Sequence, residues 1–393
     1  MQRILAYLIL ASGIALLSSC NEHEWWDYDL SVTDAPADAP AYSLSVSSDG
    51  AYALSAHGDR KIVLWDITAH KHRVLSDNGN IFSAYFVKGS HNFIWQDLDG
   101  IVHVQNVNGK ELSTFGVPPV YGHVLSSDLR TYVFSDIGWG LYLRNSEGEV
   151  EQLKSPWGKS YLGFGKLLNI QLSNDDKSIL QSGYGYEFDP GLTKEEYQAK
   201  EWRELVTVAI WNLGNGKPKE ILPGNIAKTY ATFSPDGKYV VSGDEGGRVI
   251  VWDTNKKKEL LHLGSLFHGV ISNPNEYWEN WIYDKTGLIP YPNDYSGQAV
   301  LSLKFIDTDN HYLRITANQH YAILYAIDNP LPLKYLDLGR KPYPATRDYS
   351  RNTAIDSAPE AGILVTGQAY GPGINVYKYD KKTQTLRRIW VAK

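Results

Sequence analysis

A repeated pattern of short strands runs along most of this chain, and it restricts the fold more than any other feature. The unit is an alternating strand, a turn, a second strand, a second turn and a third strand that ends in an aromatic residue. Its clearest copies run from Tyr42 to Asp66 and from Tyr230 to Asp253. Units of this size cannot bury an apolar face alone, so they are stable only when they pack against one another.

Both clear copies end in the dipeptide Trp-Asp, at Trp65-Asp66 and Trp252-Asp253, and Trp211-Asn212 is a near match. These segments resemble WD40 repeats, which form the blades of β-propellers. The resemblance is degenerate. Only Gly122-His123 matches the Gly-His pair that usually precedes the first strand, and Asp59 stands at the usual Asp position in the first copy. The resemblance implies that these signature residues have a structural role.

Four weaker copies bring the number of units to seven. Their third strands end near residues 105, 144, 325 and 377, and three of the intervals between successive units are 40, 39 and 41 residues. The remaining intervals equal this period plus an insertion. We therefore predict an all-β fold, a single seven-bladed propeller of four-stranded blades over residues 42–393. Leu386 to Val391 is expected to supply the last outer strand, with Trp26 to Val32 as the alternative.

The composition excludes several classes of protein. The chain has 12 Trp, 27 Tyr and 34 Gly, which suits short strands joined by turns. A single Cys rules out a disulfide framework and a multi-cysteine zinc site. The formal net charge of -6 gives no basic excess for binding nucleic acid.

The only cysteine follows an apolar N-terminal run, from Ile4 to Leu17, in the order Leu17-Ser18-Ser19-Cys20. This order resembles the bacterial lipobox, which implies a signal peptide at 1–19 and acyl chains such as palmitate on Cys20. Residues 20–41 then form a tether. By the same resemblance, Asn21 favours the outer membrane, with the protein facing the periplasm. An uncleaved anchor or an ordinary signal peptide is the alternative.

Four insertions lengthen the repeat, at about residues 155–168, 184–204, 265–298 and 340–352. In a propeller, all four would lie on the same face, which carries the connections between blades and the turns between second and third strands. They are rich in Trp and Tyr, residues that often anchor recognition surfaces; packing within the insertions is the alternative explanation. The binding candidates are Trp157, Tyr161, Trp202, Tyr277, Trp278, Trp281, Tyr283 and Arg347.

No motif for catalysis, a cofactor or a metal stands out. His70 and His72 lack a third ligand, and no Gly-x-Ser-x-Gly elbow occurs. We therefore expect a membrane-anchored, non-catalytic scaffold that binds an envelope protein through its insertions. The alternatives are a propeller that binds glycan or peptidoglycan, and a propeller enzyme such as a lyase or hydrolase whose groups converge across blades.

Overall fold

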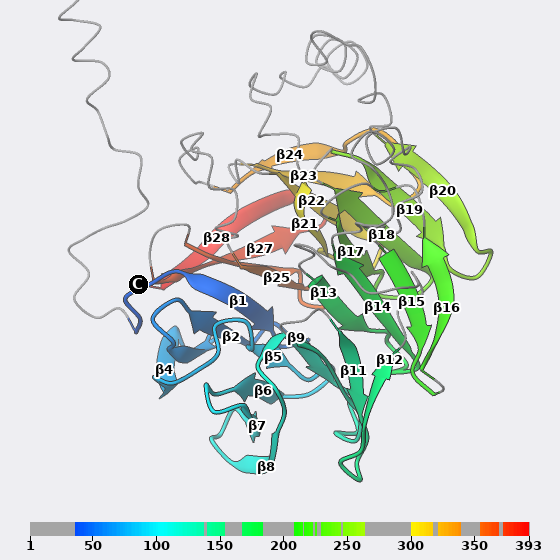
Figure 1. The fold of residues 1–393 in the computed structure, drawn as a ribbon. Coiled ribbons are helices and arrows are strands. Elements are labelled where there is room, and N and C mark those ends of the chain that lie inside the picture. The colour runs from blue at the N-terminus through cyan, green and yellow to red at the C-terminus, as the bar shows by residue number, and fades with distance from the viewer. Residues whose placement is uncertain are drawn as a thin grey trace, which may run out of the picture.

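The protein folds into seven four-stranded antiparallel sheets arranged as blades around a central axis (Figure 1). The computed structural model describes residues 36–136, 140–153, 167–183, 208–214, 216–222, 225, 229–244, 247–263, 300–316, 321–338, 354–368 and 372–392. No helix long and apolar enough to cross a membrane occurs among these residues.

Each blade takes four strands in chain order. Blade 1 comprises β1 (Ala41–Val46), β2 (Tyr52–His57), β3 (Ile62–Asp66) and β4 (Lys71–Ser76); blade 2, β5 (Tyr85–Phe86), β6 (Asn92–Gln96), β7 (Ile101–Asn106) and β8 (Glu111–Gly116); blade 3, β9 (Val120–Leu125), β10 (Tyr132–Asp136), β11 (Leu141–Arg144) and β12 (Val150–Leu153). Blade 4 comprises β13 (Leu167–Leu172), β14 (Ser178–Gly183), β15 (Val208–Asn212) and β16 (Lys217–Leu222); blade 5, β17 (Thr229–Phe233), β18 (Tyr239–Asp244), β19 (Val249–Asp253) and β20 (Lys258–Leu263). Blade 6 comprises β21 (Val300–Phe305), β22 (His311–Thr316), β23 (Tyr321–Ala326) and β24 (Lys334–Asp337); blade 7, β25 (Ile355–Ala358), β26 (Ile363–Gly367), β27 (Ile374–Asp380) and β28 (Thr385–Ala392).

The seven-bladed prediction is confirmed. Every predicted third strand is present, including those near residues 105, 144, 325 and 377, which lie in β7, β11, β23 and β27. The outer strand of blade 7 is β28, which pairs with β27 from Ile374 opposite Ala392 onward. The C-terminal segment therefore completes its own blade, which is the first of the two predicted ways to close the ring.

The core lies between blades. Seven apolar clusters are present in the described residues, and each joins two neighbouring blades. Strand β3 illustrates the reason: Val63 and Trp65 pack against blade 7, while Ile62 and Leu64 pack against blade 2. Because side chains alternate along a strand, a sheet covered on both faces needs a continuous apolar run.

The innermost strands of adjacent blades are joined by side chains. Ser43 and Ser45 on β1 accept hydrogen bonds from the backbone N–H groups of Ala84 and Phe86, at 3.1 and 3.0 Å. In the same way, Gln171 accepts from the N–H of Phe233 at 2.9 Å. Neighbouring blades do not share a sheet, so these polar side chains satisfy backbone donors at each blade's inner edge.

Blade 7 and blade 1 meet through two sets of contacts that close the ring. At the outer side, Trp390 of β28 stacks on His70 and meets the edge of Trp65, with ring centroids 5.1 and 6.2 Å apart. At the inner side, Asp356 of β25 accepts from the N–H of Val46 at 2.9 Å. The other oxygen of Asp356 binds the Lys304 ammonium of blade 6 at 2.9 Å, so one carboxylate links three blades.

Replacing Asp356 should therefore weaken the contact between blades 7 and 1 that closes the ring. We expect Asp356→Ala to lower the free energy of unfolding by about 1–3 kcal/mol, because it removes the partner of a backbone N–H and of an ammonium group. Urea denaturation of the full chain measures the change. Asp77→Ala is the control, since Asp77 is exposed in the connection between blades 1 and 2; equal effects of the two substitutions would contradict a closing role for Asp356.

Candidate functional site

The predicted signature tryptophans lie in the core at blade interfaces. Trp65 and Trp211 are 0 and 1% exposed, and Trp252 is 7% exposed. The indole N–H of Trp65 donates to Ser55 at 2.8 Å, and that of Trp211 donates to Gln181 at 2.9 Å. The indole N–H of Trp252 finds no acceptor in the part of the chain that the structure describes. The three positions thus share packing but not polar contacts.

The polar residue of each signature dipeptide holds the turn after the third strand. Asp66 accepts from the N–H of Ala69 at 2.8 Å, and Asn212 accepts from the N–H of Gly214 at 2.9 Å. Asp253 accepts from the N–H groups of Asn255 and Lys256, at 3.1 and 2.9 Å. A short polar side chain that bonds to the backbone two or three residues later stabilises such turns. These residues therefore have a structural role.

Blade 1 contains a buried chain of polar groups that begins at Trp65. Ser55 donates to His57 Nε2 at 2.7 Å, and His57 Nδ1 donates to the carbonyl of Ala39 at 2.8 Å. The pair looks like a nucleophile and its base, but Ser55 and His57 are both fully buried. Burial lowers the pKa of His57, which stays neutral. Asp59, expected at the signature position, instead accepts from the N–H of Asp38 at 2.7 Å.

Gly122-His123, the one Gly-His pair of the signature, lies within β9 and not ahead of it. His123 is fully buried; Nε2 donates to the carbonyl of Ser83 at 2.9 Å, and Nδ1 accepts from the hydroxyl of Tyr132 at 2.6 Å. This arrangement requires a neutral ring. Burial lowers the pKa of His123 to about 4.

The predicted binding and lipidation residues lie outside the described part of the chain: Trp157, Tyr161, Trp202, Tyr277, Trp278, Trp281, Tyr283, Arg347 and Cys20. The strands that flank the insertions are described. The segments between β12 and β13, between β20 and β21 and between β24 and β25 join successive blades, and the segment between β14 and β15 joins a second to a third strand. In antiparallel blades these strand ends lie on one side of the ring, which we call the insertion face. The other side is the opposite face.

The insertion face also carries an aromatic group that the sequence analysis missed. Tyr42 of β1 meets Phe82 edge-on with ring centroids 6.1 Å apart, and Phe82 meets Tyr121 of β9 at 5.0 Å. Tyr42 stands at a register shift of β1, between Ala41 and Ser43, and its ring lies beside Gly58 in the turn between β2 and β3. We call these three aromatic residues the aromatic arc. They come from three blades, and their spacing of about one repeat gives no local motif.

The opposite face is held together by its turns. In four blades, a Ser hydroxyl donates to the Asp two residues later at 2.6–2.7 Å: Ser47 to Asp49, Ser126 to Asp128, Ser173 to Asp175 and Ser234 to Asp236. These bonds lower the pKa of Asp128 and Asp175. The turns also bind one another: His91 to Asp49, Ser127 to Asp176, Lys88 to Asn174, Asn174 to Pro235, Asn310 to Asp236 and Lys381 to Asp309.

A cavity of about 240 Å³ occupies the central channel on the side of the opposite face, lined by the innermost strands of all seven blades. Its Lys304–Asp356 ion pair joins blades, and Gln171 holds the backbone of β17. Burial raises the pKa of Tyr85 to about 12, with the negative charge of Asp356 contributing. Most of the described polar side chains at this cavity hold neighbouring blades together.

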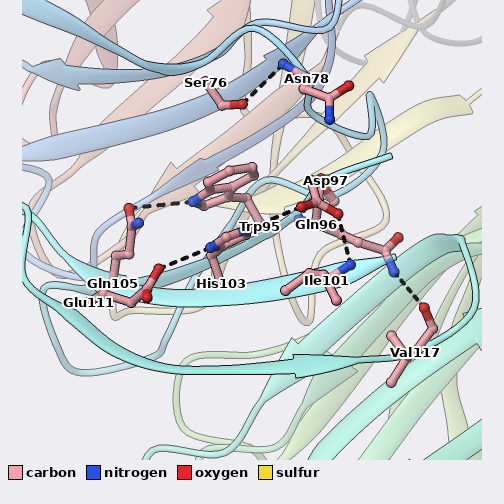
Figure 2. A network of polar contacts seen from close by, with 11 residues as sticks. Ser76, Asn78, Trp95, Gln96, Asp97, Ile101, His103, Gln105, Glu111 and Val117 are labelled. Atoms are coloured by element: carbon pink, nitrogen blue, oxygen red, sulfur yellow. Dashed lines mark hydrogen bonds and ion pairs between the residues drawn. The ribbon is translucent and has the colours of Figure 1, made fainter. Parts of the chain in front are cut away.

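Blade 2 carries a polar network around a stacked pair of rings (Figure 2). His103 stacks on Trp95 with ring centroids 4.1 Å apart, and its two nitrogens meet Glu111 at 3.0 Å and Asp97 at 3.3 Å. The bond from His103 lowers the pKa of Glu111. The two carboxylates lie on opposite edges of the imidazole, so they cannot share one metal ion with it. The described residues contain no group of three side chains suited to a metal.

Comparison with known proteins identifies the repeats. Residues 31–66 and 216–253 match the model of the WD domain, G-beta repeat. The solved β-propeller domain of Cps50 (Swd1) from Myceliophteria thermophila is similar in fold, with a TM-score of 0.58 and 11% identity over 89% of this chain and 99% of that chain. The chain therefore combines two segments that match this repeat with the fold of a seven-bladed β-propeller.

Two curated relatives match over short segments. A 75-residue segment is 36% identical to the small ribosomal subunit protein RACK1y of Oryza sativa subsp. japonica. This segment covers 18% of this chain and 22% of that protein. A 94-residue segment is 32% identical to the small ribosomal subunit protein RACK1 of Neurospora crassa, which covers 23% and 29%. The chain thus spans less than a third of either relative.

Because the signature tryptophans differ in their hydrogen bonds, replacing them should lower the free energy of unfolding by different amounts. Trp65→Phe should lower the free energy of unfolding by about 1–2 kcal/mol more than Trp252→Phe. Both changes remove similar ring volume, but only the first removes a donor to a buried hydroxyl. Urea denaturation measures the free energy of unfolding of both variants. Trp211→Phe is measured beside them and should resemble Trp65→Phe, since Trp211 also donates to a buried side chain. Equal losses at all three positions would refute the difference.

The lowered pKa of His123 predicts acid sensitivity. The unfolded chain takes up a proton near pH 6.5, whereas folded His123 does so only near its pKa of about 4. The contribution of His123 to the free energy of unfolding is therefore fully present above pH 6.5 and falls as the pH drops toward 4. Between pH 7.5 and 5 the fall is about 2 kcal/mol. Relative to the wild type, His123→Gln should lose this part of the pH dependence, measured by urea denaturation at both pH values. His91→Gln, at an exposed site, should keep it.

Proposed function

We propose that this protein is a lipid-anchored scaffold of the bacterial envelope, a non-catalytic WD40-repeat propeller that binds a protein partner through its insertion face. Cys20 carries the lipid, and the propeller faces the periplasm from the outer membrane. The insertions supply the contact residues, with Trp157, Trp202, Trp278, Trp281 and Arg347 among them. The sequence around Cys20 supports the anchor, and the repeats support the scaffold.

The proposal that the partner binds to the insertion face rests on a difference between the polar contacts of the two faces. On the opposite face, Asp49, Asp176 and Asp236 bind neighbouring turns, so these carboxylates hold the ring together. On the insertion face, Tyr42 is 38% exposed beside Phe82, and all four insertions attach there. Exposed aromatic groups on a rigid scaffold are typical of recognition surfaces.

Photo-crosslinking in cells tests this surface. A photoreactive residue at position 157, 278 or 283 should give discrete protein adducts, and the same residue at position 238 on the opposite face should give none. Lys238 is the better control than its neighbour Gly237, because Gly237 has a φ of 72° that a side chain would strain. Adducts are detected by a shift on denaturing gels and identified by mass spectrometry.

Two outcomes would contradict the proposed partner. Adducts from position 238 alone would place recognition on the opposite face. Absence of protein adducts at every position, together with co-sedimentation of the purified protein with peptidoglycan sacculi, would indicate that the insertion face binds glycan.

A further inference from the structure

The insertion face of blade 2 carries two carboxylates that the fold does not use. Asp77 lies in the connection between β4 and β5, and Asp99 lies in the turn between β6 and β7. Both side chains are exposed, and neither carboxylate makes a hydrogen bond or ion pair with the residues that the structure describes. On the opposite face, by contrast, Asp49, Asp176 and Asp236 all bind neighbouring turns. Asp77 and Asp99 are therefore available to a partner.

The segments that carry these two carboxylates run side by side. The N–H of Leu98 donates to the carbonyl of Asn78 at 3.0 Å. Asp77 and Asp99 are the direct sequence neighbours of these two residues. Leu98 is itself 43% exposed, so an apolar side chain accompanies the two carboxylates at the surface.

The aromatic arc continues from the same connection. Phe82 contacts both Tyr42 and Tyr121, with ring centroids 6.1 and 5.0 Å away. The N–H of Phe82 donates to the Asn80 side chain at 3.1 Å, and the Asn80 amide donates to Gln96 at 2.9 Å. Because Asn80 and Gln96 are buried, the connection that carries Phe82 is fixed to the body of blade 2. A surface that is already rigid loses little conformational entropy when a partner binds.

The described part of the insertion face has an excess of negative charge over blades 1 to 3. Its acidic residues are Asp38, Asp59, Asp77, Asp97, Asp99 and Asp136, and its basic residues are Arg60 and Lys61. Lys61 is already paired with Asp38 at 3.1 Å. Peptidoglycan and anionic lipids carry negative charge, so these carboxylates would repel them. A partner with positive charge is attracted instead.

We propose that Asp77, Asp99, Leu98 and the aromatic arc form one surface, the acidic–aromatic surface, which binds a basic segment of the protein partner that presents arginine side chains. A guanidinium group pairs with carboxylates and stacks on aromatic rings, while the arginine stem covers apolar side chains such as Leu98. A lysine ammonium pairs with the same carboxylates but does not stack as a planar group. The inference rests on the proposed function and deepens it, because it names the chemistry of the partner that the insertion face binds.

Titration with a fluorescein-labelled hexa-arginine peptide tests the carboxylates. Fluorescence anisotropy measures the dissociation constant of the peptide for the purified full chain at low ionic strength, where surface charges are least screened. The double substitution Asp77→Asn/Asp99→Asn should raise this constant about fivefold. The control, Glu147→Gln/Asp328→Asn, removes the same charge from exposed side chains in two turns of the opposite face and should change the constant less than about twofold. Equal effects of the two double substitutions, or no binding to the wild type, overturn the acidic–aromatic surface.

A single substitution tests the aromatic part of the surface. Tyr42→Leu should raise the dissociation constant of hexa-arginine about threefold and that of a hexa-lysine peptide by less, because it removes a ring for stacking but keeps an apolar side chain. Urea denaturation establishes that each variant is folded under the conditions of the titration. Equal effects on the two peptides, or no effect on either, overturn the role of the aromatic arc.

Crosslinking in cells separates this inference from the proposed function. A photoreactive residue in place of Leu98 should capture the same protein as position 278, with the crosslink mapped by mass spectrometry to a segment that contains arginine. The same residue at position 328 on the opposite face should not capture it. Capture from position 278 without capture from position 98, or a crosslinked segment without arginine, overturns the basic segment and leaves the proposed function standing. Absence of adducts from positions 157, 278 and 283 overturns the proposed function, and the assignment of the basic segment to that partner falls with it.

Discussion

The ring depends on satisfying the inner edges of separate sheets. The innermost strand of each blade pairs with a strand on one edge only, so the backbone groups on its other edge, beside the channel, have no strand partner. Buried N–H groups without an acceptor destabilise the fold. Side chains from the adjacent blade supply the missing acceptors: Ser43 and Ser45 for blade 2, Gln171 for blade 5 and Asp356 for blade 1. These bonds also fix how far each blade slides past the next, because a side chain reaches only one backbone position.

The same constraint explains how the two faces differ. On the opposite face, short turns lie close enough to bind one another, as Ser127 binds Asp176 across blades 3 and 4. A long insertion there would break these contacts. On the insertion face, Asn80 in the connection between blades 1 and 2 also donates to the carbonyl of Val120, but the four insertions lie in other connections.

The fold could be predicted from the sequence because its signal is periodic. Alternating apolar residues located all seven blades, supported in five of them by a Trp or Tyr at the end of the third strand, and Leu386 to Val391 located the strand that closes the last one. The polar contacts could not be predicted this way. His57 and His123 lie within strands, and neither occupies the position that the repeat signature gives to histidine. The aromatic arc joins Tyr42, Phe82 and Tyr121 from three blades, and only the closed ring brings them together.

The signature residues show why a repeat can lose its usual polar network and still form a blade. Trp65, Trp211 and Trp252 all fill a blade interface, yet the first bonds to Ser55, the second to Gln181 and the third has no acceptor among the described residues. Burial of the large ring is the shared requirement, and the polar partner varies with the blade. In blade 1 the partner of the tryptophan, Ser55, also bonds to a second side chain, His57. The chain of hydrogen bonds from Trp65 through Ser55 and His57 ends on the carbonyl of Ala39, so the core of the first blade also holds the residues just before β1 in place.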